Sequence, residues 1–341
     1  MSLTVLIGGQ YGDEGKGTIA AFITLKDKAH AAVRSQGPQA GHTIFYEGKK
    51  YLFRQIPSAV FNPDTQLLIA VGAFVRPDVV LEEIEMYKSF GVERRLKIDE
   101  NATAIFSQHI EREKELVQSI GSVGTGVGPA LVDRVMRKPD VLVKFVPSLE
   151  RFSKNVNVSN IVNDFLDEGK SVFIEGAHGV ALSNLHGSYP YTNAYDNTAS
   201  ALLSQVGIGP KRADKIILVF KSFVTRVGKG PLEGELPAEE INKLGWTEYG
   251  SVSGRLRRAA PFDVSLAKNS IRLNTPTDLA ISKVDVLFPK ARGITDYSNL
   301  SPECQEWIEN LEKKLRVPIT LIKTGPEIKD TIDLRKEKGT L

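Results

Sequence analysis

The stretch Gly8–Thr18 holds the residues of this chain that are best suited to chemistry. It reads Gly-Gly-Gln-Tyr-Gly-Asp-Glu-Gly-Lys-Gly-Thr, between an apolar run at 3–7 and a second apolar run at 19–23. A strand, a glycine-rich turn and a helix in this order place backbone N–H groups and a helix N-terminus around phosphate oxygens. Lys16 would add a mobile positive charge. The stretch therefore predicts a phosphate-binding loop.

This loop differs from the common phosphate-binding pattern GxxxxGK[ST]. That pattern needs glycine at position 10, which is Gln10, and serine or threonine at position 17, which is Gly17. The loop also carries Asp13, which would repel a phosphate unless it holds Mg²⁺ or takes a proton. A tight turn with a solvated Asp-Glu pair is the structural alternative, but it leaves the conformational cost of so many glycines unexplained. We therefore predict that the loop takes part in catalysis.

Other candidate groups follow strand-like segments farther along the chain. His42 lies on a second glycine turn, where a histidine is a candidate general acid. The segment 255–258 holds three arginines, which suit bidentate binding of carboxylates and phosphates or form a basic surface turn. At 282–285, Ser-Lys-Val-Asp follows a strand, and its aspartate could accept two hydrogen bonds from guanine. A third glycine-rich segment, 119–129, precedes a basic cluster at 133–138 that is either a solvated helix face or a phosphate site.

The elements that must position these groups alternate along the chain. Apolar runs predict strands, and amphipathic runs with capping residues predict helices. The predicted strands lie at 31–34, 67–72, from 171, at 216–220, before Ser282 and at 319–322, and the helices at 77–86, 160–167, from 197 and at 302–314. This order predicts an α/β fold, a doubly wound, mostly parallel sheet with its loops at the C-terminal ends of the strands. Because no Pro/Ser/Gly linker divides the chain, we expect a single domain over residues 1–341.

Composition limits the classes of partner. The chain is 41% hydrophobic and 25% charged, with a net charge of +3, and its basic residues lie beside acids without interleaved aromatics, so we expect no nucleic acid. One cysteine, Cys304, excludes an internal disulfide and a cysteine-based metal cluster. We find neither an apolar stretch near the ~18 residues of a membrane span nor the basic region of a signal peptide. We expect a cytoplasmic protein with no membrane partner.

The motifs together resemble the adenylosuccinate synthetase family. In that family's order they are GGQYGDEGKGT, AGHT, SIGSVGTGVGPA, DRVMRK, EGAHG, GSYPYTN, TRVGKGP, SGRLRR, SKVD and KTGPE, from residue 3 to about 335. The length resembles the short archaeal-type branch or its phage relatives. The resemblance implies a ligase of purine biosynthesis that condenses IMP with L-aspartate and uses GTP to form a 6-phosphoryl intermediate. It also implies Mg²⁺ as the metal and a homodimer in the cytoplasm, which is the host cytoplasm if the protein is phage-encoded.

The resemblance also implies roles for individual residues. Asp13 matches the base that takes the N1 proton of IMP, His42 matches the acid that supports the transferred phosphoryl group, and His178 stands at a third catalytic position. The implied Mg²⁺ ligands are Asp13 and Gly41. The implied GTP site comprises Gly12, Gly15, Lys16, Gly17, Thr18, Gly41, His42, Thr43, Lys283, Asp285 and Gly325. The implied acceptor-nucleotide site comprises Asp13, Gln39, Val123, Arg137, His178, Leu182, Asn193 and Arg255, with Arg137 contributed across the dimer interface. The implied aspartate site comprises Val227, Ser253, Arg255 and Arg257.

Four positions of the implied acceptor pocket depart from the family pattern. The family usually has Asn, Thr, Gln and Thr where this chain has Gln39, Val123, His178 and Asn193. IMP is the expected acceptor. The first alternative is a phage-type synthetase that converts dGMP to 2-amino-deoxyadenylosuccinate, although such forms carry Ser at the position of Asp13. The alternative from another class is a non-catalytic GTP-binding regulatory protein, which would lack the base or the acid.

Overall fold

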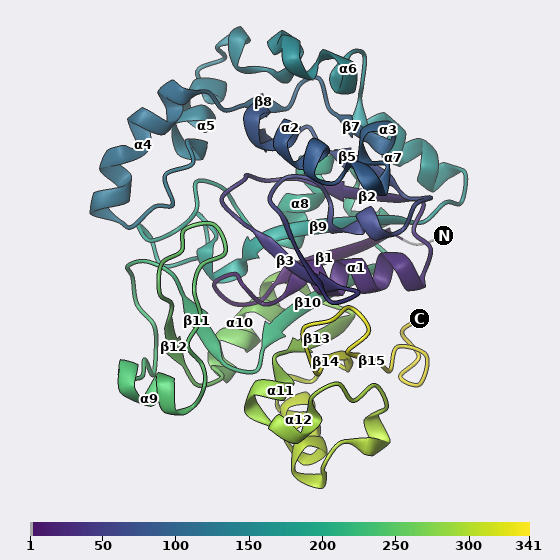
Figure 1. Cartoon of the computed structure of the whole chain (residues 1–341), viewed down its shortest axis with the longest axis vertical. Helices are drawn as coiled ribbons and strands as arrows, with labels where there is room; N and C mark the ends of the chain where they lie inside the picture. The colour runs from purple at the N-terminus through teal and green to yellow at the C-terminus, as the bar shows by residue number, and fades with distance from the viewer. Residues whose placement is uncertain (1–2) are drawn as a thin grey trace.

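The computed structural model describes residues 3–341, and a nine-stranded sheet forms its centre (Figure 1). Neighbouring strands pair in parallel, except for the antiparallel pair at the C-terminal edge. The order across the sheet is β15 (Thr331–Asp333), β14 (Ile319–Lys323), β13 (Asp278–Ser282), β10 (Lys215–Lys221), β1 (Leu3–Gly8), β9 (Val172–Gly179), β2 (Ala31–Arg34), β5 (Gln66–Ile69) and β7 (Leu96–Ile98). The predicted doubly wound, mostly parallel sheet is confirmed.

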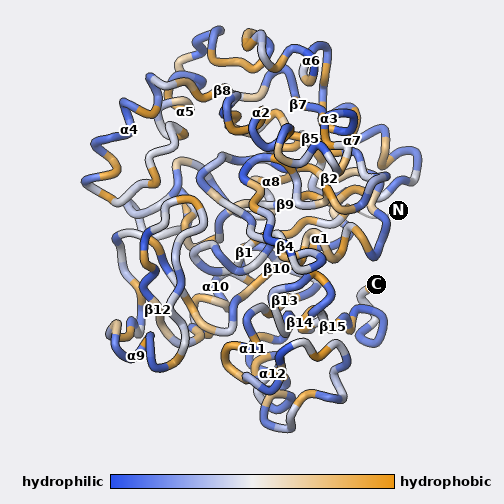
Figure 2. The backbone as a smooth tube through the Cα atoms, in the orientation of Figure 1, coloured by the Kyte–Doolittle hydropathy of each residue, from blue (hydrophilic) through white to orange (hydrophobic). Residues whose placement is uncertain are grey.

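Helices cover both faces of the sheet, which is why its central strands are apolar throughout. Side chains alternate along β1, so that Val5 and Ile7 join the core on one face and Leu6 joins the core on the other. Helix α1 (Lys16–Lys26) packs on the face of Leu6. The helices on the opposite face are α7 (Val158–Asp167), α8 (Ala199–Val206), α10 (Val264–Asn274) and α12 (Pro302–Leu315). Figure 2 shows hydrophobic segments along the central strands and hydrophilic ones at the periphery.

Most predicted elements lie where the sequence placed them. Helix α2 spans Pro77–Met86, and α8 begins after Thr198, whose side chain accepts a hydrogen bond from the Ala201 amide. Helix α7 begins earlier than predicted because Asn157 caps it, and β5 ends at Ile69 rather than at residue 72. Short elements that the sequence did not predict include β6 (Phe74–Val75), β8 (Thr103–Ala104), α3 (Val92–Arg95), α6 (Glu150–Ser153), α9 (Ala238–Lys243) and α11 (Val284–Leu287).

Additional elements surround the C-terminal ends of the parallel strands. They are the hairpin β3 (His42–Tyr46) with β4 (Lys49–Phe53), the helices α4 (Ser107–Ser119) and α5 (Val127–Val135), and the pair β11 (Val224–Arg226) with β12 (Arg258–Ala260). Figure 1 shows α4 and α5 above β11 and β12 on the same side of the sheet. Ligands of open α/β sheets bind at this edge. No helix within residues 3–341 has both the length and the apolar character needed to cross a bilayer.

Candidate active site

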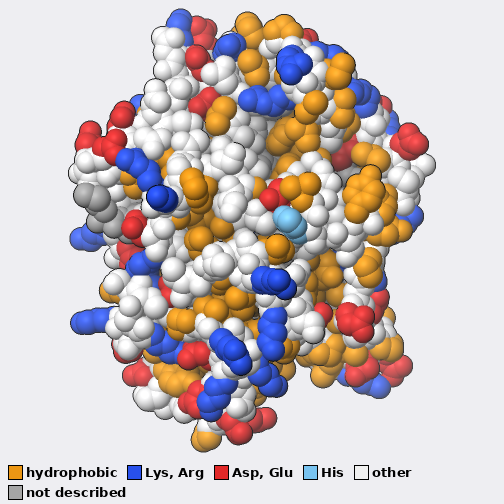
Figure 3. All heavy atoms as spheres, turned by 180° about the vertical axis from the view of Figure 1, so that it is seen from behind, with side chains coloured by type: hydrophobic (Ala, Val, Ile, Leu, Met, Phe, Trp, Pro, Cys, Tyr) orange, Lys and Arg blue, Asp and Glu red, His pale blue; other side chains and the backbone are white. Residues whose placement is uncertain are grey.

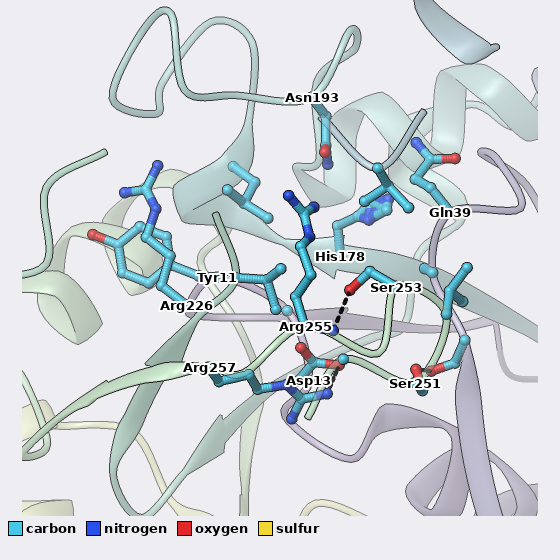
Figure 4. Close-up of a pocket in the computed structure, with 18 of the residues that line it drawn as sticks. Tyr11, Asp13, Gln39, His178, Asn193, Arg226, Ser251, Ser253, Arg255 and Arg257 are labelled. Atoms are coloured by element: carbon cyan, nitrogen blue, oxygen red, sulfur yellow. Dashed lines mark hydrogen bonds and ion pairs between the residues drawn. The ribbon is translucent and has the colours of Figure 1, made fainter. Parts of the chain in front are cut away.

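A cavity of about 1150 Å³ lies where the loops after the parallel strands meet. Its lining includes every predicted site residue except Arg137. The residues of the predicted GTP site that line it are Gly12, Gly15, Lys16, Gly17, Thr18, Gly41, His42, Thr43, Lys283, Asp285 and Gly325. The residues of the predicted acceptor and aspartate sites that line it are Asp13, Gln39, Val123, His178, Leu182, Asn193, Val227, Ser253, Arg255 and Arg257. Figure 4 shows Asp13 against Arg257, with Gln39, His178 and Asn193 on the far side of Arg255.

The glycine loop after β1 is held by an internal carboxylate. Glu14 is fully buried and accepts hydrogen bonds from the amides of Gln10 at 3.0 Å and Gly12 at 2.9 Å. It also forms an ion pair with Lys16 Nζ at 2.6 Å. The prediction that Lys16 is mobile is therefore wrong, because a buried ammonium group needs a counter-charge in place. Glu14 is a structural anion beneath the loop, and not half of a solvated pair.

The loop also brings the helix α1 and the histidine turn close together. A Cβ atom on Gly17 would lie 2.6 Å from the Cβ of His42, so only glycine allows this approach. Gly15 adopts a left-handed conformation with φ of 80° and caps α1, which carries no acidic residue in its first turn. The amides of this turn are available to an anion in the cavity.

Asp13 stands in a left-handed conformation, with φ of 63°, at the entrance of the same helix. Its Oδ1 is paired with Arg257 Nη2 at 2.6 Å, and Oδ2 accepts no hydrogen bond from the described residues. Burial raises the pKa of Asp13, although Arg257 and Lys221 oppose that shift. A carboxylate with a raised pKa is the stronger base. Asp13 therefore has a free oxygen and the proton affinity that a general base needs.

His42 belongs to a buried network that the sequence did not predict. Its Nδ1 contacts Glu175, which also accepts from Arg34 Nη1 at 3.1 Å and from the amide and hydroxyl of Ser58 at 2.7 and 2.6 Å. Despite its burial, Glu175 has its pKa lowered to about 2 by His42 and Arg34. The charged carboxylate accepts a hydrogen bond from Nδ1–H of His42. Nε2 is therefore the ring nitrogen that can contact a ligand. Burial and Arg34 lower the pKa of His42 to about 4, so the ring is neutral in the protein alone.

His178 is the last residue but one of β9, in a left-handed conformation with φ of 56°, and its side chain is buried. Burial and the charge of Lys16 lower its pKa to about 3, so the ring is neutral. It stacks at 6.0 Å on Tyr195, which stacks in turn at 5.6 Å on Phe74. The Tyr195 hydroxyl accepts a hydrogen bond from Gln39 Nε2 at 2.9 Å. Tyr195 thus holds two of the residues that depart from the family pattern, and the sequence did not predict it.

Three of the four departing residues have unpaired polar atoms. The buried atoms Gln39 Oε1, His178 Nε2 and Asn193 Nδ2 have no hydrogen-bond partner among the described residues. Such atoms are uncommon in native proteins. Because all three residues line the cavity, the unpaired atoms indicate where a polar ligand would bind. Val123, the fourth departing residue, also lines the cavity.

A second wall is formed by residues after β13 and β14. Lys283 has φ of 61° at the start of α11, in which Asp285 lies. Lys323, which the sequence did not predict as a site residue, ends β14 and lines the cavity with Gly325. Burial lowers the pKa of Lys323 to about 8, although Asp285 is among the acids that oppose the shift. The carboxylate of Asp285 and the ammonium groups of Lys283 and Lys323 therefore all lie at this end of the cavity.

The segment between β11 and β12 carries the predicted aspartate site. Arg255 donates to the Gly121 carbonyl at 2.9 Å, which ties this segment to the third glycine-rich segment. The Ser253 hydroxyl accepts from the Arg255 amide at 3.3 Å. Arg257 donates to Glu248 at 2.6 Å and forms an ion pair with Asp13. The sequence did not predict Glu248 as a site residue. Because Arg257 contacts both Glu248 and Asp13, its guanidinium lies between two carboxylates.

Whether the predicted ligands Asp13 and Gly41 can bind Mg²⁺ depends on which of their oxygen atoms lack other partners. Among the described residues, no three His, Cys, Asp or Glu side chains are placed to hold a metal together. Proteins commonly bind Mg²⁺ through one or two carboxylates plus substrate phosphates. Asp13 has a free oxygen, and the Gly41 carbonyl accepts one hydrogen bond, from Ser251 at 3.0 Å, which leaves a lone pair. These two groups fit a Mg²⁺ ion held mainly by phosphates.

Arg137 is the exception among the predicted residues. Its side chain is exposed at the end of α5, and it does not line the cavity of its own chain. The exposed apolar residues of α4, α5 and the residue after α5 are Leu116, Val117, Val132, Val135 and Met136. Figure 3, viewed from behind, shows hydrophobic side chains gathered on the side where these helices lie. A role for Arg137 in catalysis would therefore require a second copy of the chain.

Comparisons with known proteins agree with the motifs. The family model described as Adenylosuccinate synthetase matches residues 5–156 and 138–290. The adenylosuccinate synthetase of Methanosphaera stadtmanae is 42% identical over 99% of both chains. That of Archaeoglobus fulgidus is 44% identical over 99% of this chain and 100% of its own.

Solved structures show the same fold. The fully ligated adenylosuccinate synthetase from Plasmodium falciparum has a TM-score of 0.89 at 22% identity, covering 98% of this chain and 100% of its own. The cyanophage S-2L succinoaminodeoxyadenylate synthetase, bound to dGMP and to dATP as an energy donor, has a TM-score of 0.81 at 22% identity, covering 97% of this chain and 95% of its own. The family model and the full-length relatives together show that this chain belongs to the adenylosuccinate synthetase family.

Proposed function

We propose that the protein is a GTP-dependent ligase that condenses a 6-oxopurine nucleotide, in the first place IMP, with L-aspartate. The products are adenylosuccinate, GDP and phosphate. The observation that carries this proposal is that Asp13, His42 and Arg257 line one cavity, with Arg257 directly on Asp13. A base, an acid and a carboxylate-binding arginine thus lie within the space of one cavity.

The chemistry follows from the poor leaving ability of the purine 6-oxygen. Asp13 takes the N1 proton, so that O6 attacks the γ-phosphorus of GTP and the bond to the β-phosphate oxygen breaks, releasing GDP. The aspartate amine then attacks C6, the C6–O6 bond breaks, and phosphate leaves with the former O6 and with the proton that the amine loses. Mg²⁺ at Asp13 and Gly41 would offset the negative charge of the phosphates. The role of Asp13 as a base rests on the free oxygen and raised pKa described above.

His42 supports the transferred phosphoryl group through Nε2. The ring is neutral in the protein alone, but bound phosphates bring negative charge that opposes the effect of Arg34 and favours the protonated ring. With Nδ1–H held by Glu175, the added proton lies on Nε2, where it can be donated to a phosphoryl oxygen. Residues of the first loop and the histidine turn complete the phosphate site that we propose: Gly12, Gly15, Lys16, Gly17, Thr18, Gly41 and Thr43.

The guanine and aspartate sites are proposed on two walls of the cavity that share Glu248, which contacts Lys283 at one wall and Arg257 at the other. The Asp285 carboxylate would accept the N1–H and 2-amino hydrogens of guanine, a donor pair that adenine lacks. Lys283 would lay its stem along the purine, with Gly325 nearby. Aspartate would bind to Arg255 and Arg257, whose guanidinium groups suit carboxylates, together with Ser253 and Val227.

The acceptor site is proposed around the unpaired atoms of Gln39, His178 and Asn193, with Val123 and Leu182 as apolar neighbours. We favour IMP because a carboxylate at position 13 suits a purine that carries N1–H and no neighbouring 2-amino group. The same unpaired atoms support the second candidate, a nucleotide such as dGMP with an extra donor at position 2. The fold of the cyanophage enzyme bound to dGMP agrees with this candidate.

One assay tests the acceptor and the phosphate donor together. Purified protein with Mg²⁺ and aspartate is offered IMP, dIMP, GMP or dGMP, each with GTP or with ATP, and the products are separated by chromatography. We expect adenylosuccinate from IMP with GTP, and much less product with ATP because adenine cannot donate twice to Asp285. Turnover of dGMP without IMP would overturn the choice of acceptor. No nucleotide-dependent product with any acceptor would favour the regulatory GTP-binding protein.

We also propose that the active enzyme is a homodimer in the cytoplasm, with residues 1–341 as one catalytic domain. The nine-stranded sheet, whose strands come from residues 3 to 333, supports one domain. The exposed apolar residues of α4, α5 and Met136 support a second copy as their partner. In that dimer Arg137 would reach the 5′-phosphate of the acceptor bound to the other chain.

Mixing two inactive variants tests the role of Arg137. Arg137→Leu and Asp13→Asn should each be inactive, but a mixed dimer builds one intact site from the two chains. If the subunits exchange at random, about a quarter of the parental activity should return. The control is a chain with both substitutions mixed with Asp13→Asn, which should restore nothing. A fully active monomer in sedimentation at assay concentration would contradict the proposal.

A further inference from the structure

Glu248 lies where three cations meet. Its Oε2 is 2.8 Å from Lys221 Nζ and 2.6 Å from Arg257 Nη1, and its Oε1 is 3.2 Å from Lys283 Nζ. Although burial opposes it, Lys221, Lys283 and Arg257 hold the pKa of this carboxyl well below its usual range. Glu248 therefore carries a full negative charge that the three cations share.

Two of these cations belong to different proposed sites. Lys283 lies at the guanine site, whereas Arg257 lies at the aspartate site and touches Asp13 at 2.6 Å. The guanidinium of Arg257 uses Nη1 for Glu248 and Nη2 for Asp13, and its Nε is buried without a partner among the described residues. With both Nη groups fixed, the planar guanidinium has one orientation. Glu248 therefore determines where the remaining donor of Arg257 points.

The Lys283 pair is the part of this cluster that a ligand can change. The Lys283 side chain is 46% exposed, whereas that of Glu248 is 13% exposed. A guanine base lying along the lysine stem would exclude water from this pair. An ion pair is stronger in a medium of lower dielectric constant. Binding of the base would therefore strengthen the ion pair between Lys283 and Glu248. Because Glu248 also contacts Arg257, it would then restrict the position of Arg257 more strongly.

We propose that Glu248 is a positioning residue that connects the guanine site with Arg257, so that GTP and aspartate each favour the binding of the other. Such coupling is reciprocal, because the free energy that GTP adds to aspartate binding equals the one that aspartate adds to GTP binding. The inference rests on the proposed function, since it assumes GTP and aspartate as ligands of these two walls.

The test is the Michaelis constant for aspartate measured at several GTP concentrations. In the parent we expect this constant to fall as GTP rises, by about fivefold or more. In Glu248→Gln we expect it to rise by about tenfold and to lose its dependence on GTP. The turnover number at saturation should fall by less than the Michaelis constant rises. Glu248→Asp, which keeps the charge on a shorter side chain, should restore part of the coupling.

Two controls separate positioning from folding. Glu235→Gln removes a carboxylate that pairs with the neighbouring Arg258 and is not part of the cavity lining, and it should leave the aspartate constant unchanged within about twofold. Glu248→Gln also leaves the fully buried Lys221 without its counter-charge, which is destabilising. Adding Lys221→Met should restore thermal stability but keep the raised aspartate constant.

The outcomes are distinct. Glu248→Gln with a parental aspartate constant, or with a parental dependence on GTP, would overturn the inference. So would a parental constant in the Glu248→Gln/Lys221→Met variant, because Glu248 would then be only the counter-ion of Lys221. A parent that forms no product from any acceptor nucleotide would defeat the proposed function instead.

Discussion

Replacing Asp13 with asparagine is expected to lower the turnover number with IMP, GTP and aspartate by about three orders of magnitude or more. The amide cannot accept the N1 proton, and it is a much weaker ligand for Mg²⁺ than a carboxylate. Without loss of that proton, O6 remains a poor nucleophile toward GTP. Steady-state kinetics with saturating substrates measure this loss directly.

The substitution is well suited to separate chemistry from structure. Asp13 has φ of 63°, and asparagine tolerates the left-handed region about as well as aspartate does. The asparagine side-chain oxygen can still accept a hydrogen bond from Arg257, which forms an ion pair with Asp13 in the parent. We therefore expect the melting temperature of the variant to lie within a few degrees of the parent's. A folded variant with turnover within about tenfold of the parent would contradict the assignment of Asp13 as the base.

The parts of the fold that could be predicted from sequence are those with a local signal. Continuous apolar runs predicted β1, β2 and β10, because strands buried on both faces need no polar side. The boundaries of α2 follow from a proline that can begin a helix. The hairpin β3–β4 was missed although Glu47 and Gly48 both have positive φ, as a two-residue hairpin turn requires. A Glu-Gly pair is a weaker hairpin signal than Asn-Gly, so the turn did not stand out.

The site residues that were missed depend on contacts between distant segments. Glu175 lies 133 positions from His42. Glu248 contacts Arg257 within its own segment, but it also contacts Lys221 and Lys283, which lie in two other segments of the chain. Neither Glu175, inside β9, nor Glu248, outside any helix or strand, has a local sequence pattern that identifies its partner. Even for Glu14, two positions from Lys16, the sequence did not predict a buried ion pair, because its burial depends on how the loop packs on β9 and β10. Glycine-rich loops can be predicted from a short stretch of sequence. The carboxylates that form hydrogen bonds and ion pairs with these loops cannot, because their contacts depend on the folded structure.

Glu175→Gln is expected to lower the turnover number by about two to four orders of magnitude while the Michaelis constants for GTP and IMP change by less than about fivefold. A neutral amide does not hold the Nδ1 hydrogen of His42 as the carboxylate does, and Arg34 Nη1, 3.0 Å from Nδ1, can then donate to that nitrogen. The ring would change tautomer and would lose the charge that stabilises a second proton. The proposed binding groups for GTP and IMP do not include Glu175, so the effect should fall on turnover.

Glu83→Gln is the matched control, because Glu83 is also a buried carboxylate. It accepts the amides of Gln55 and Ile56 at 3.1 and 3.0 Å, and it is not part of the cavity lining. Both substitutions replace a buried acceptor with an amide that brings unwanted donors, so both should lower the melting temperature. Only Glu175→Gln should lower turnover in the protein that remains folded. If the two variants lost turnover equally, Glu175 would be a structural residue, and His42 would be oriented by Arg34 and the hairpin alone.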